Sequence, residues 1–428
     1  MRAILCAAAA VALVLLGTPA RAAGHTATTP VQHFVYLMQG DHTFDNYFGT
    51  YPGADGIPAA TCVPVDLKDA AKGCVQPYAL NGKAPVTLSA GQSVIDRQYD
   101  QGKMDGFVDA YERQGRDGAA AMGYYDRRDL PFYWNAADRY ELFDRFFAAS
   151  REGTRPNRSA WVSGTAFDPQ QPTIFDRLEA AGVSWKFYVQ DYNPKQTFRS
   201  VSRTDPATQT VRVPLLNYPR FVDDPQLNQH IVDLDQYYRD LENGTLPAVA
   251  YIASSGAGER SARSIPAGQT LVRNLSTQLM LSPYWSSSAL LWSYDGSGGW
   301  YDHVKPPAGH GFRVPAILVS PYVPRGKVND TQLDTTSALR FIEQNWSLQP
   351  LPGQDTAAGT LSTAFDFTAG PRQAELIPAT ATAPATAPRV RPSLVYEVYG
   401  SAAGFSVLLV VAAVAGVRAP KGALPWAR

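Results

Sequence analysis

Short apolar runs recur through the middle of the chain. They are HFVYLM (33–38), SWKFYV (184–189), AVAYIA (248–253), SALLWSY (288–294) and PAILVS (315–320). Continuous apolar runs of this length are typical of strands whose two faces are both covered. Five such strands predict a central sheet with a layer on each side.

Segments with helical signals separate these runs. Helices are predicted at 173–182, which ends at a Gly, at 269–280, which stops before Pro283, and at 335–346, which has an apolar face. The alternation predicts an α/β fold with a mostly parallel sheet covered by helices. Polar segments at 64–130 and 191–230 are too long for plain connections, so we expect them to be loop or cap insertions.

Size and charge narrow the picture further. The chain has 428 residues, 45% of them apolar, so one large domain, expected at 24–366, is the default. Lys and Arg number 38 and so do Asp and Glu, which gives a net charge of zero. No overall field therefore attracts nucleic acid, and nucleic acid is not an expected partner.

Both ends of the chain carry membrane-related signals. Residues 1–23 have an apolar run and an Ala-Arg-Ala site, which predict a cleaved signal peptide. A Pro/Ala/Thr-rich stalk is expected at 367–396, a transmembrane helix at 397–418 and a cytoplasmic tail at 419–428. The predicted location is the cell membrane, crossed once by the C-terminal helix, with the bulk of the chain outside the cytoplasm. A buried helix or an apolar tail is the alternative for 397–418.

Only two cysteines follow the predicted signal peptide, Cys62 and Cys74. In an oxidising compartment they are expected to form a disulfide that closes a short loop. A metal site is the weaker interpretation, because no further cysteine completes a ligand set.

Two acidic residues follow predicted strands directly. Asp41 comes just after the run 33–38, and Asp295 comes directly after the run 288–294. Ligands of an α/β sheet bind at the carboxyl ends of its strands, so the pair favours a cation or phosphate site. Taken singly, each acid is better explained as a turn residue that accepts hydrogen bonds from nearby N–H groups.

A hydroxyl completes the candidate chemistry. Thr154 in REGTRPNRSAW precedes Pro156, a pattern that suits the first turn of a helix. A hydroxyl at a helix start lies near free N–H groups that can stabilise an anion, as a nucleophile for phosphorus requires. The simpler alternative is that Thr154 only caps its helix.

Several longer motifs resemble a known family. FVYLMQGDHTFDNYFGTYPGADGIP, GKMDGFV, SPYWSSSALLWSYDGSGGWYDHVKPP and GFRVPAILVSPYVPRG are similar to the bacterial phosphoesterase family that contains phospholipases C and a related acid phosphatase. The resemblance covers roughly residues 31–350. It implies an alkaline-phosphatase-like fold, a Ser or Thr nucleophile, a divalent metal ion and cleavage of phosphate esters such as phospholipid head groups.

The family's site residues carry over unevenly. Thr154 matches the nucleophile and Asn157 follows it at the usual spacing, while Asp41, Asp295 and Thr154 are the implied metal ligands. His303 also matches, as a catalytic candidate or as a structural residue.

Asp41 replaces an Asn of the family, and four further family positions are altered in this chain. Glycines replace two acidic ligands, and two histidines are lost; the positions are Gly40, Gly296, Ala90 and Arg260. Arg260 is a candidate for binding the substrate phosphate.

Two functions remain open from the sequence. One is a membrane-tethered phosphoesterase resembling phospholipase C, with a metal-assisted Thr154 nucleophile and a depleted metal site. The other is a catalytically inactive family member that binds phosphorylated head groups or a partner at the cell surface.

Overall fold

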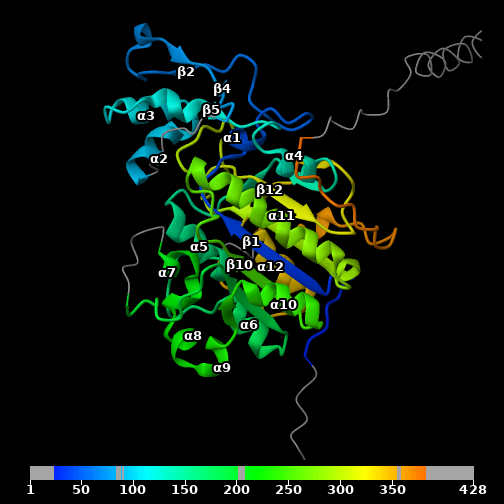
Figure 1. Cartoon of the computed structure of the whole chain (residues 1–428). Helices are drawn as coiled ribbons and strands as arrows, with labels where there is room; N and C mark the ends of the chain where they lie inside the picture. The colour runs from blue at the N-terminus through cyan, green and yellow to red at the C-terminus, as the bar shows by residue number, and fades with distance from the viewer. Residues whose placement is uncertain (1–23, 83–87, 89–90, 201–207, 354–357, 382–428) are drawn as a thin grey trace, which may run out of the picture. The chain divides into compact units, whose positions relative to one another are not determined.

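The computed structural model describes residues 24–82, 88, 91–200, 208–353 and 358–381. Its centre is an eight-stranded sheet in the order β13-β6-β12-β11-β1-β10-β8-β9. Figure 1 labels β1, β10 and β12 of this sheet. In that order the strands are β13 (Lys327–Asn329), β6 (Glu141–Phe143), β12 (Ala316–Val319), β11 (Ser288–Tyr294), β1 (His33–Gln39), β10 (Val249–Ala253), β8 (Trp185–Val189) and β9 (Ile231–Asp233).

The sheet is mostly parallel, as the sequence predicts. Strands β11, β1, β10, β8 and β9 run parallel to one another, and β12 pairs antiparallel with both β11 and β6. All five apolar runs form strands of this sheet, and every residue of β10, β11 and β12 is buried. The predicted α/β class is therefore confirmed.

Helices cover both faces of the sheet. One layer contains α5 (Thr154–Ser163), α6 (Ile174–Ala180) and α12 (Ser337–Asn345), and the other contains α4 (Pro131–Ala137), α10 (Asp235–Asn243) and α11 (Ile265–Leu281). Aromatic contacts fix the first layer: Trp161 of α5 packs on Tyr36 and Tyr251. On the opposite face, Tyr133 of α4 packs on Trp292. The helices predicted at 173–182, 269–280 and 335–346 are α6, α11 and α12.

Strand register brings the ends of β1, β10 and β11 to one edge. Met38 pairs with Ala253, and Gln39 pairs with Tyr294. The segments that begin at Gly40, Ser254 and Asp295 therefore leave the sheet side by side. These three segments carry residues of the candidate site.

The two polar insertions contain short elements. The first includes α2 (Gln92–Tyr99) and α3 (Phe107–Glu112), and the second includes α7 (Gln209–Arg212), α8 (Pro219–Asp223) and α9 (Pro225–Asn228). Residues of the first insertion form an apolar cluster of their own, in which Phe107 packs on Tyr301 and Phe312.

Several short elements complete the described chain. They are α1 (Phe44–Phe48), the strand pairs β2 (Val63–Pro64) with β3 (Cys74–Val75), β4 (Tyr78–Ala79) with β5 (Gly123–Tyr124) and β7 (Phe146–Phe147) with β14 (Leu333–Asp334), and the 3₁₀ turns 70–72, 100–102, 118–122, 214–217, 262–264, 285–287 and 361–364.

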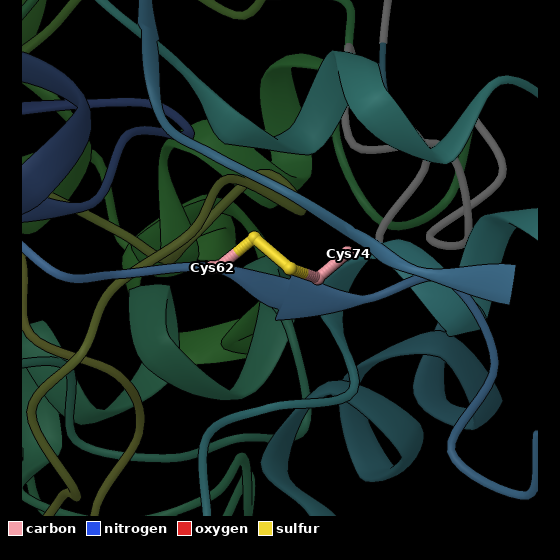
Figure 2. The surroundings of a disulfide bond; sticks show 2 residues. All are labelled: Cys62 and Cys74. Carbon is pink, nitrogen blue, oxygen red and sulfur yellow. A yellow bond between two sulfur atoms is a disulfide. The ribbon is translucent and has the colours of Figure 1, made fainter. Parts of the chain in front are cut away.

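The predicted disulfide is confirmed. Cys62 and Cys74 are bonded, with their Cα atoms 5.4 Å apart, next to the β2/β3 pair (Figure 2). Only 12 positions separate the two residues, so the bond closes a short loop at the start of the first insertion.

The predicted membrane location is corrected by the structure. Within the described ranges, no helix has the length and apolar character needed to cross a bilayer. The described part of the chain therefore does not contain the membrane-spanning helix on which the predicted single-pass location depends. The predicted signal peptide (1–23), transmembrane helix (397–418) and tail (419–428) lie outside the described residues.

The expected stalk begins inside the described part of the chain. Residues 367–381 pack near α4 and β6, where Asn135 Nδ2 donates to the carbonyl of Pro378 at 2.9 Å and to that of Thr380 at 2.7 Å. Ile377 is buried. This segment therefore makes ordered contacts beyond residue 366, where the sequence places the domain boundary.

Candidate functional site

One guanidinium joins three of the predicted site residues. Arg260 Nη1 donates to Asp41 Oδ2 at 2.5 Å and to Thr154 Oγ1 at 3.1 Å, and its Nη2 donates to Asp295 Oδ2 at 2.5 Å. The four residues come from the ends of β1, β10 and β11 and from the start of α5. The expected convergence of Asp41, Asp295 and Thr154 is therefore present, with Arg260 between them.

A second arginine, Arg158, also binds Asp295. Arg158 Nε donates to the same Oδ2 atom at 2.6 Å, and Arg158 Nη2 donates to the carbonyl of Gln39 at 3.1 Å. Both side chains of this pair are buried, whereas those of Arg260 and Asp41 are 22% and 24% exposed. The ion pair of Arg158 with Asp295 thus lies buried at the bottom of the site, and the site opens to solvent at Arg260 and Asp41.

The two acids titrate differently because their surroundings differ. Burial raises the pKa of Asp41 to about 6; Arg260 opposes this shift and the nearby Asp295 adds to it. Burial also acts to raise the pKa of Asp295, but Arg260 and Arg158 outweigh it and hold that pKa below its ordinary value. Asp295 therefore has the lower pKa of the two, and Asp41 is the acid closer to exchanging a proton near neutral pH.

Thr154 occupies the first position of α5. The N-cap is Gly153, with φ of 90°, so Thr154 is not the capping residue of this helix. In the described structure its hydroxyl oxygen accepts a hydrogen bond from Arg260. The hydroxyl therefore faces the charged groups of the site at a helix N-terminus, where partial positive charge favours an anion.

Asn157 shapes the turn that presents Thr154. Its Oδ1 accepts from the Ser150 N–H at 2.7 Å, and its Nδ2 donates to the carbonyls of Ser150 and Gly153 at 2.8 and 2.9 Å. All of these contacts are to main-chain atoms of the preceding loop. Asn157 thus supports this turn, and its expected catalytic role stays a prediction.

Glu259 fixes the segment that carries Arg260. Its buried carboxylate accepts hydrogen bonds from the hydroxyls of Tyr47 at 2.6 Å and Tyr294 at 3.0 Å, and also from Tyr133. Gln39 Nε2 lies 3.4 Å from the same group. Because Glu259 is anchored in the core, its neighbour Arg260 is directed toward the edge of the sheet.

Two glycines stand where the family has acidic ligands, and they differ in their surroundings. A Cβ at position 40 would lie 2.9 Å from Arg260 Cγ and 3.0 Å from Cζ. A Cβ at position 296 would have Asn157 Nδ2 as its nearest neighbour, at 4.0 Å. Arg260 thus fills the space beside Gly40, whereas the space beside Gly296 is open.

His303 belongs to a separate cluster. Its Nδ1 lies 2.7 Å from Asp45 Oδ2 and its Nε2 lies 3.2 Å from Asp55 Oδ1. The guanidinium of Arg313 lies among these groups and donates to Asp302 at 3.2 Å and to Asp45 at 2.9 Å. In the structure, His303 is held in this ion-pair cluster, which favours the structural alternative for His303, and a catalytic role for it stays a prediction.

Some residues and contacts of the site were not predicted from the sequence. Arg158 was not singled out, although it follows Thr154 by four positions, and such residues share one face of a helix. The tyrosines around Glu259 come from three distant segments, so no local pattern groups them. His42, which stands beside Asp41 in the sequence, is buried and contacts Asn46 and the carbonyl of Glu259 instead.

The fold and the site together define an α/β protein that carries charged and hydroxyl side chains at the carboxyl ends of its parallel strands. The profile of the Phosphoesterase family matches residues 31–349, about three quarters of the chain. The chain belongs to the Phosphoesterase family.

Relatives of known class agree with this assignment. Phospholipase C A of Mycobacterium tuberculosis is 28% identical, over 80% of this chain and 78% of the relative. The non-hemolytic phospholipase C of Pseudomonas aeruginosa is 26% identical, over 79% of this chain and 57% of the relative. The family and these relatives support a hydrolase that acts on phosphate esters.

A solved structure shows a slight resemblance. A protein of the alkaline phosphatase superfamily from Vibrio parahaemolyticus has a TM-score of 0.37 and 11% identity, over 78% of this chain and 72% of that one.

The family generally uses a divalent metal ion, and the residues around Thr154 do not fit one. Arg260 lies between the two carboxylates, and Gly40 and Gly296 bring no ligand atom. Two unit charges 4 Å apart interact by about 4 kcal/mol at an effective dielectric constant of 20, and a divalent ion beside a guanidinium meets about twice that repulsion.

A second set of ligand atoms lies in the other cluster. Oxygen and nitrogen atoms of Asp45, Asp302 and His303 all fall within 4.8 Å of one another. Arg313 already donates to both carboxylates of this set, so the protein itself offsets part of their negative charge. This group is at most a weak place for a cation.

Proposed function

We propose that the protein hydrolyses phosphate esters of the phospholipase C type, with Thr154 as the nucleophile. The observation that carries this proposal is the single contact set in which Arg260 reaches Thr154, Asp41 and Asp295 at the carboxyl edge of the sheet. The site offers a hydroxyl, a fixed cation for phosphate oxygens and a carboxylate with a pKa of about 6.

The proposed reaction has two steps. Thr154 Oγ1 forms a bond to phosphorus while the bond to the ester oxygen breaks and the leaving group takes up a proton. Asp41 shares Arg260 Nη1 with Thr154, so it is the carboxylate placed to receive the hydroxyl proton, directly or through a water molecule. Water then attacks the phosphothreonine, which releases phosphate or its monoester and restores the hydroxyl.

Arg260 and the start of α5 stabilise charge in this scheme. A guanidinium donates to phosphate oxygens in a planar, paired geometry, and free N–H groups at the helix start add to this attraction. Names of the relatives point to phospholipid head groups as the substrate class. A phosphodiester between a glyceride and a head group is the substrate we propose.

The test compares the wild type with Thr154→Ala and Thr154→Ser. Full-length protein is assayed on a nitrophenyl phosphodiester, a nitrophenyl phosphomonoester and phosphatidylcholine vesicles, with and without EDTA. We expect Thr154→Ala to fall to the background rate and Thr154→Ser to retain measurable turnover, since serine supplies the same hydroxyl. Equal rates for the wild type and Thr154→Ala would remove Thr154 as the nucleophile.

The second candidate is a binding protein without turnover. It is favoured by the position of Arg260, which already forms ion pairs with both Asp41 and Asp295, so that both carboxylates near the hydroxyl are paired. In this case all three proteins give the background rate. Binding of the wild type to phosphatidylcholine vesicles, lost in Arg260→Ala, would then support recognition of the phosphate alone.

A further inference from the structure

All three predicted metal ligands of the site contact one protein cation. Asp41, Asp295 and Thr154 each accept a hydrogen bond from the guanidinium of Arg260, at 2.5, 2.5 and 3.1 Å. A bound metal ion would draw the same three oxygen atoms toward one centre. Here the centre is formed by the two terminal nitrogens of an arginine.

The arginine is locked in this place from two sides. Its side chain fills the space beside Gly40, where even a methyl group would come within 3.0 Å of its carbons. The preceding residue, Glu259, is buried and held by tyrosine hydroxyls, and its φ of 63° sets the direction in which the chain continues. The absence of a side chain at position 40 and the presence of Arg260 are therefore one structural arrangement.

Charge in the site is balanced without a metal ion. Asp41 and Asp295 supply two negative charges, and Arg260 and Arg158 supply two positive charges within hydrogen-bonding distance. Asp295 Oδ1 is buried and has no hydrogen-bond partner in the described structure, so one ligand atom stays unused beside the guanidinium. A divalent ion could use that atom only against the repulsion of both arginines.

We propose that Arg260 is the resident cation of this site, in the place that a divalent metal ion takes in the family, and that the site binds a phosphate group without metal. Removal of the Arg260 side chain leaves Asp41, Asp295 and Thr154 as three oxygen ligands around an open space, which is a site for a divalent cation. The inference rests on the proposed function only in assigning the same site, and it does not require turnover.

Mn²⁺ binding to the full-length protein tests the proposal. The protein is stripped with EDTA, dialysed and titrated with Mn²⁺, and free Mn²⁺ is followed by electron paramagnetic resonance. We expect Arg260→Ala to bind one Mn²⁺ at least tenfold more tightly than the wild type does, and Arg260→Ala with Asp41→Asn to lose this gain. Arg325→Ala is the matched control, because it removes a positive charge from an exposed pair with Glu375. It should bind Mn²⁺ as the wild type does.

Three results would overturn the proposal. They are tight wild-type Mn²⁺ binding that Asp41→Asn abolishes, no gain in folded Arg260→Ala, or an equal gain in Arg325→Ala. If Arg260→Ala does not fold, the comparison of wild type with Asp41→Asn decides, together with Arg260→Lys, which keeps the charge and should bind no more Mn²⁺ than the wild type. Mn²⁺ binding that His303→Ala removes from the wild type belongs to the Asp45 cluster, and Asp41→Asn leaves it unchanged.

The outcome of the Mn²⁺ titration does not depend on whether the protein hydrolyses phosphate esters. An inactive wild type with the expected Mn²⁺ pattern would refute the proposed turnover and keep Arg260 as the resident cation. An active wild type that loses its activity in EDTA, and regains it with Mn²⁺, would refute the resident cation and keep the phosphoesterase.

Discussion

The side chain of Arg260 lies directly over Gly40, and a Cβ at position 40 would stand 2.9 Å from Arg260 Cγ and 3.0 Å from Cζ. We therefore expect Gly40→Ala to displace the guanidinium and to lower the free energy of unfolding by about 1–3 kcal/mol, the usual cost of overpacking a filled space. Urea denaturation followed by tryptophan fluorescence measures this change.

Gly296→Ala is the matched control for Gly40→Ala. The nearest atom to a Cβ at position 296 is Asn157 Nδ2 at 4.0 Å, and neither glycine has a positive φ. We expect a change within about 0.5 kcal/mol, as for substitutions that meet no close neighbour. Equal losses for the two variants would contradict the close contact between residues 40 and 260.

Asp295→Asn is expected to destabilise the fold strongly. Asp295 is fully buried and receives Arg158 and Arg260 on one oxygen atom. An amide leaves a buried guanidinium without its countercharge, and breaking a buried pair in this way costs about 3–5 kcal/mol. Chemical denaturation measures the loss.

Asp223→Asn provides the comparison for Asp295→Asn. Its pair with Arg199 is exposed on both sides, with side chains 51% and 53% accessible. Water screens such a pair, so we expect no measurable change in stability. A loss for Asp295→Asn as small as this one would show that Asp295 is not a central charge of the fold.

Glu259 makes stability depend on pH in a definite direction. Burial raises its pKa from 4.5 to about 7, with the hydrogen bonds from Tyr133, Tyr47 and Tyr294 acting against the shift. Between these two values the folded chain binds more protons than the unfolded chain. The stabilisation is thus complete below pH 4.5 and is lost as the pH rises through about 7.

The variant Glu259→Gln isolates this contribution. From pH 4.5 to about 7.5 the stability of the wild type should fall by up to about 3 kcal/mol relative to the variant, since each pKa unit corresponds to about 1.4 kcal/mol. Denaturation curves for both proteins across this range give the difference. A difference that stays constant with pH, or grows in favour of the wild type, would contradict a raised pKa.

The disulfide is expected to stabilise one region only. Loss of the bond in Cys62→Ser with Cys74→Ser should cost about 2–3 kcal/mol on the chain-entropy account, because the closed loop is short. Limited proteolysis should show earlier cleavage between residues 62 and 82, with the central sheet intact. Unchanged cleavage and unchanged stability would show that the apolar cluster around Phe107 orders this segment without the bond.

The sequence predicted the position of the acids correctly because their placement is local. Asp41 and Asp295 directly follow buried strands, and the carboxyl ends of parallel neighbours meet at one edge. Thr154 was placed at a helix start by the same kind of local signal. The roles assigned to these residues stay predictions until the proposed variants are measured.

The family resemblance implied that Arg260 belongs to the site, but its contacts with Asp41, Asp295 and Thr154 could not be predicted from the sequence. Arg260 lies 219 positions from Asp41 and 106 from Thr154, and its direction depends on Glu259 being held by tyrosines of other segments. The partners of His303 could not be predicted for a related reason: the Asp45 and Asp55 carboxylates hold its ring, and sequence spacing does not show which acids a histidine meets.

By itself the sequence determined the α/β class, the main strands and helices, the disulfide and the family, because these depend on apolar periodicity and on contiguous motifs. Only the tertiary structure decided which charge occupies the centre of the site. The long side chain of Arg260 can reach several partners. Burial, the nearby countercharges and the space left by Gly40 select among these partners. These quantities arise only when distant segments pack together.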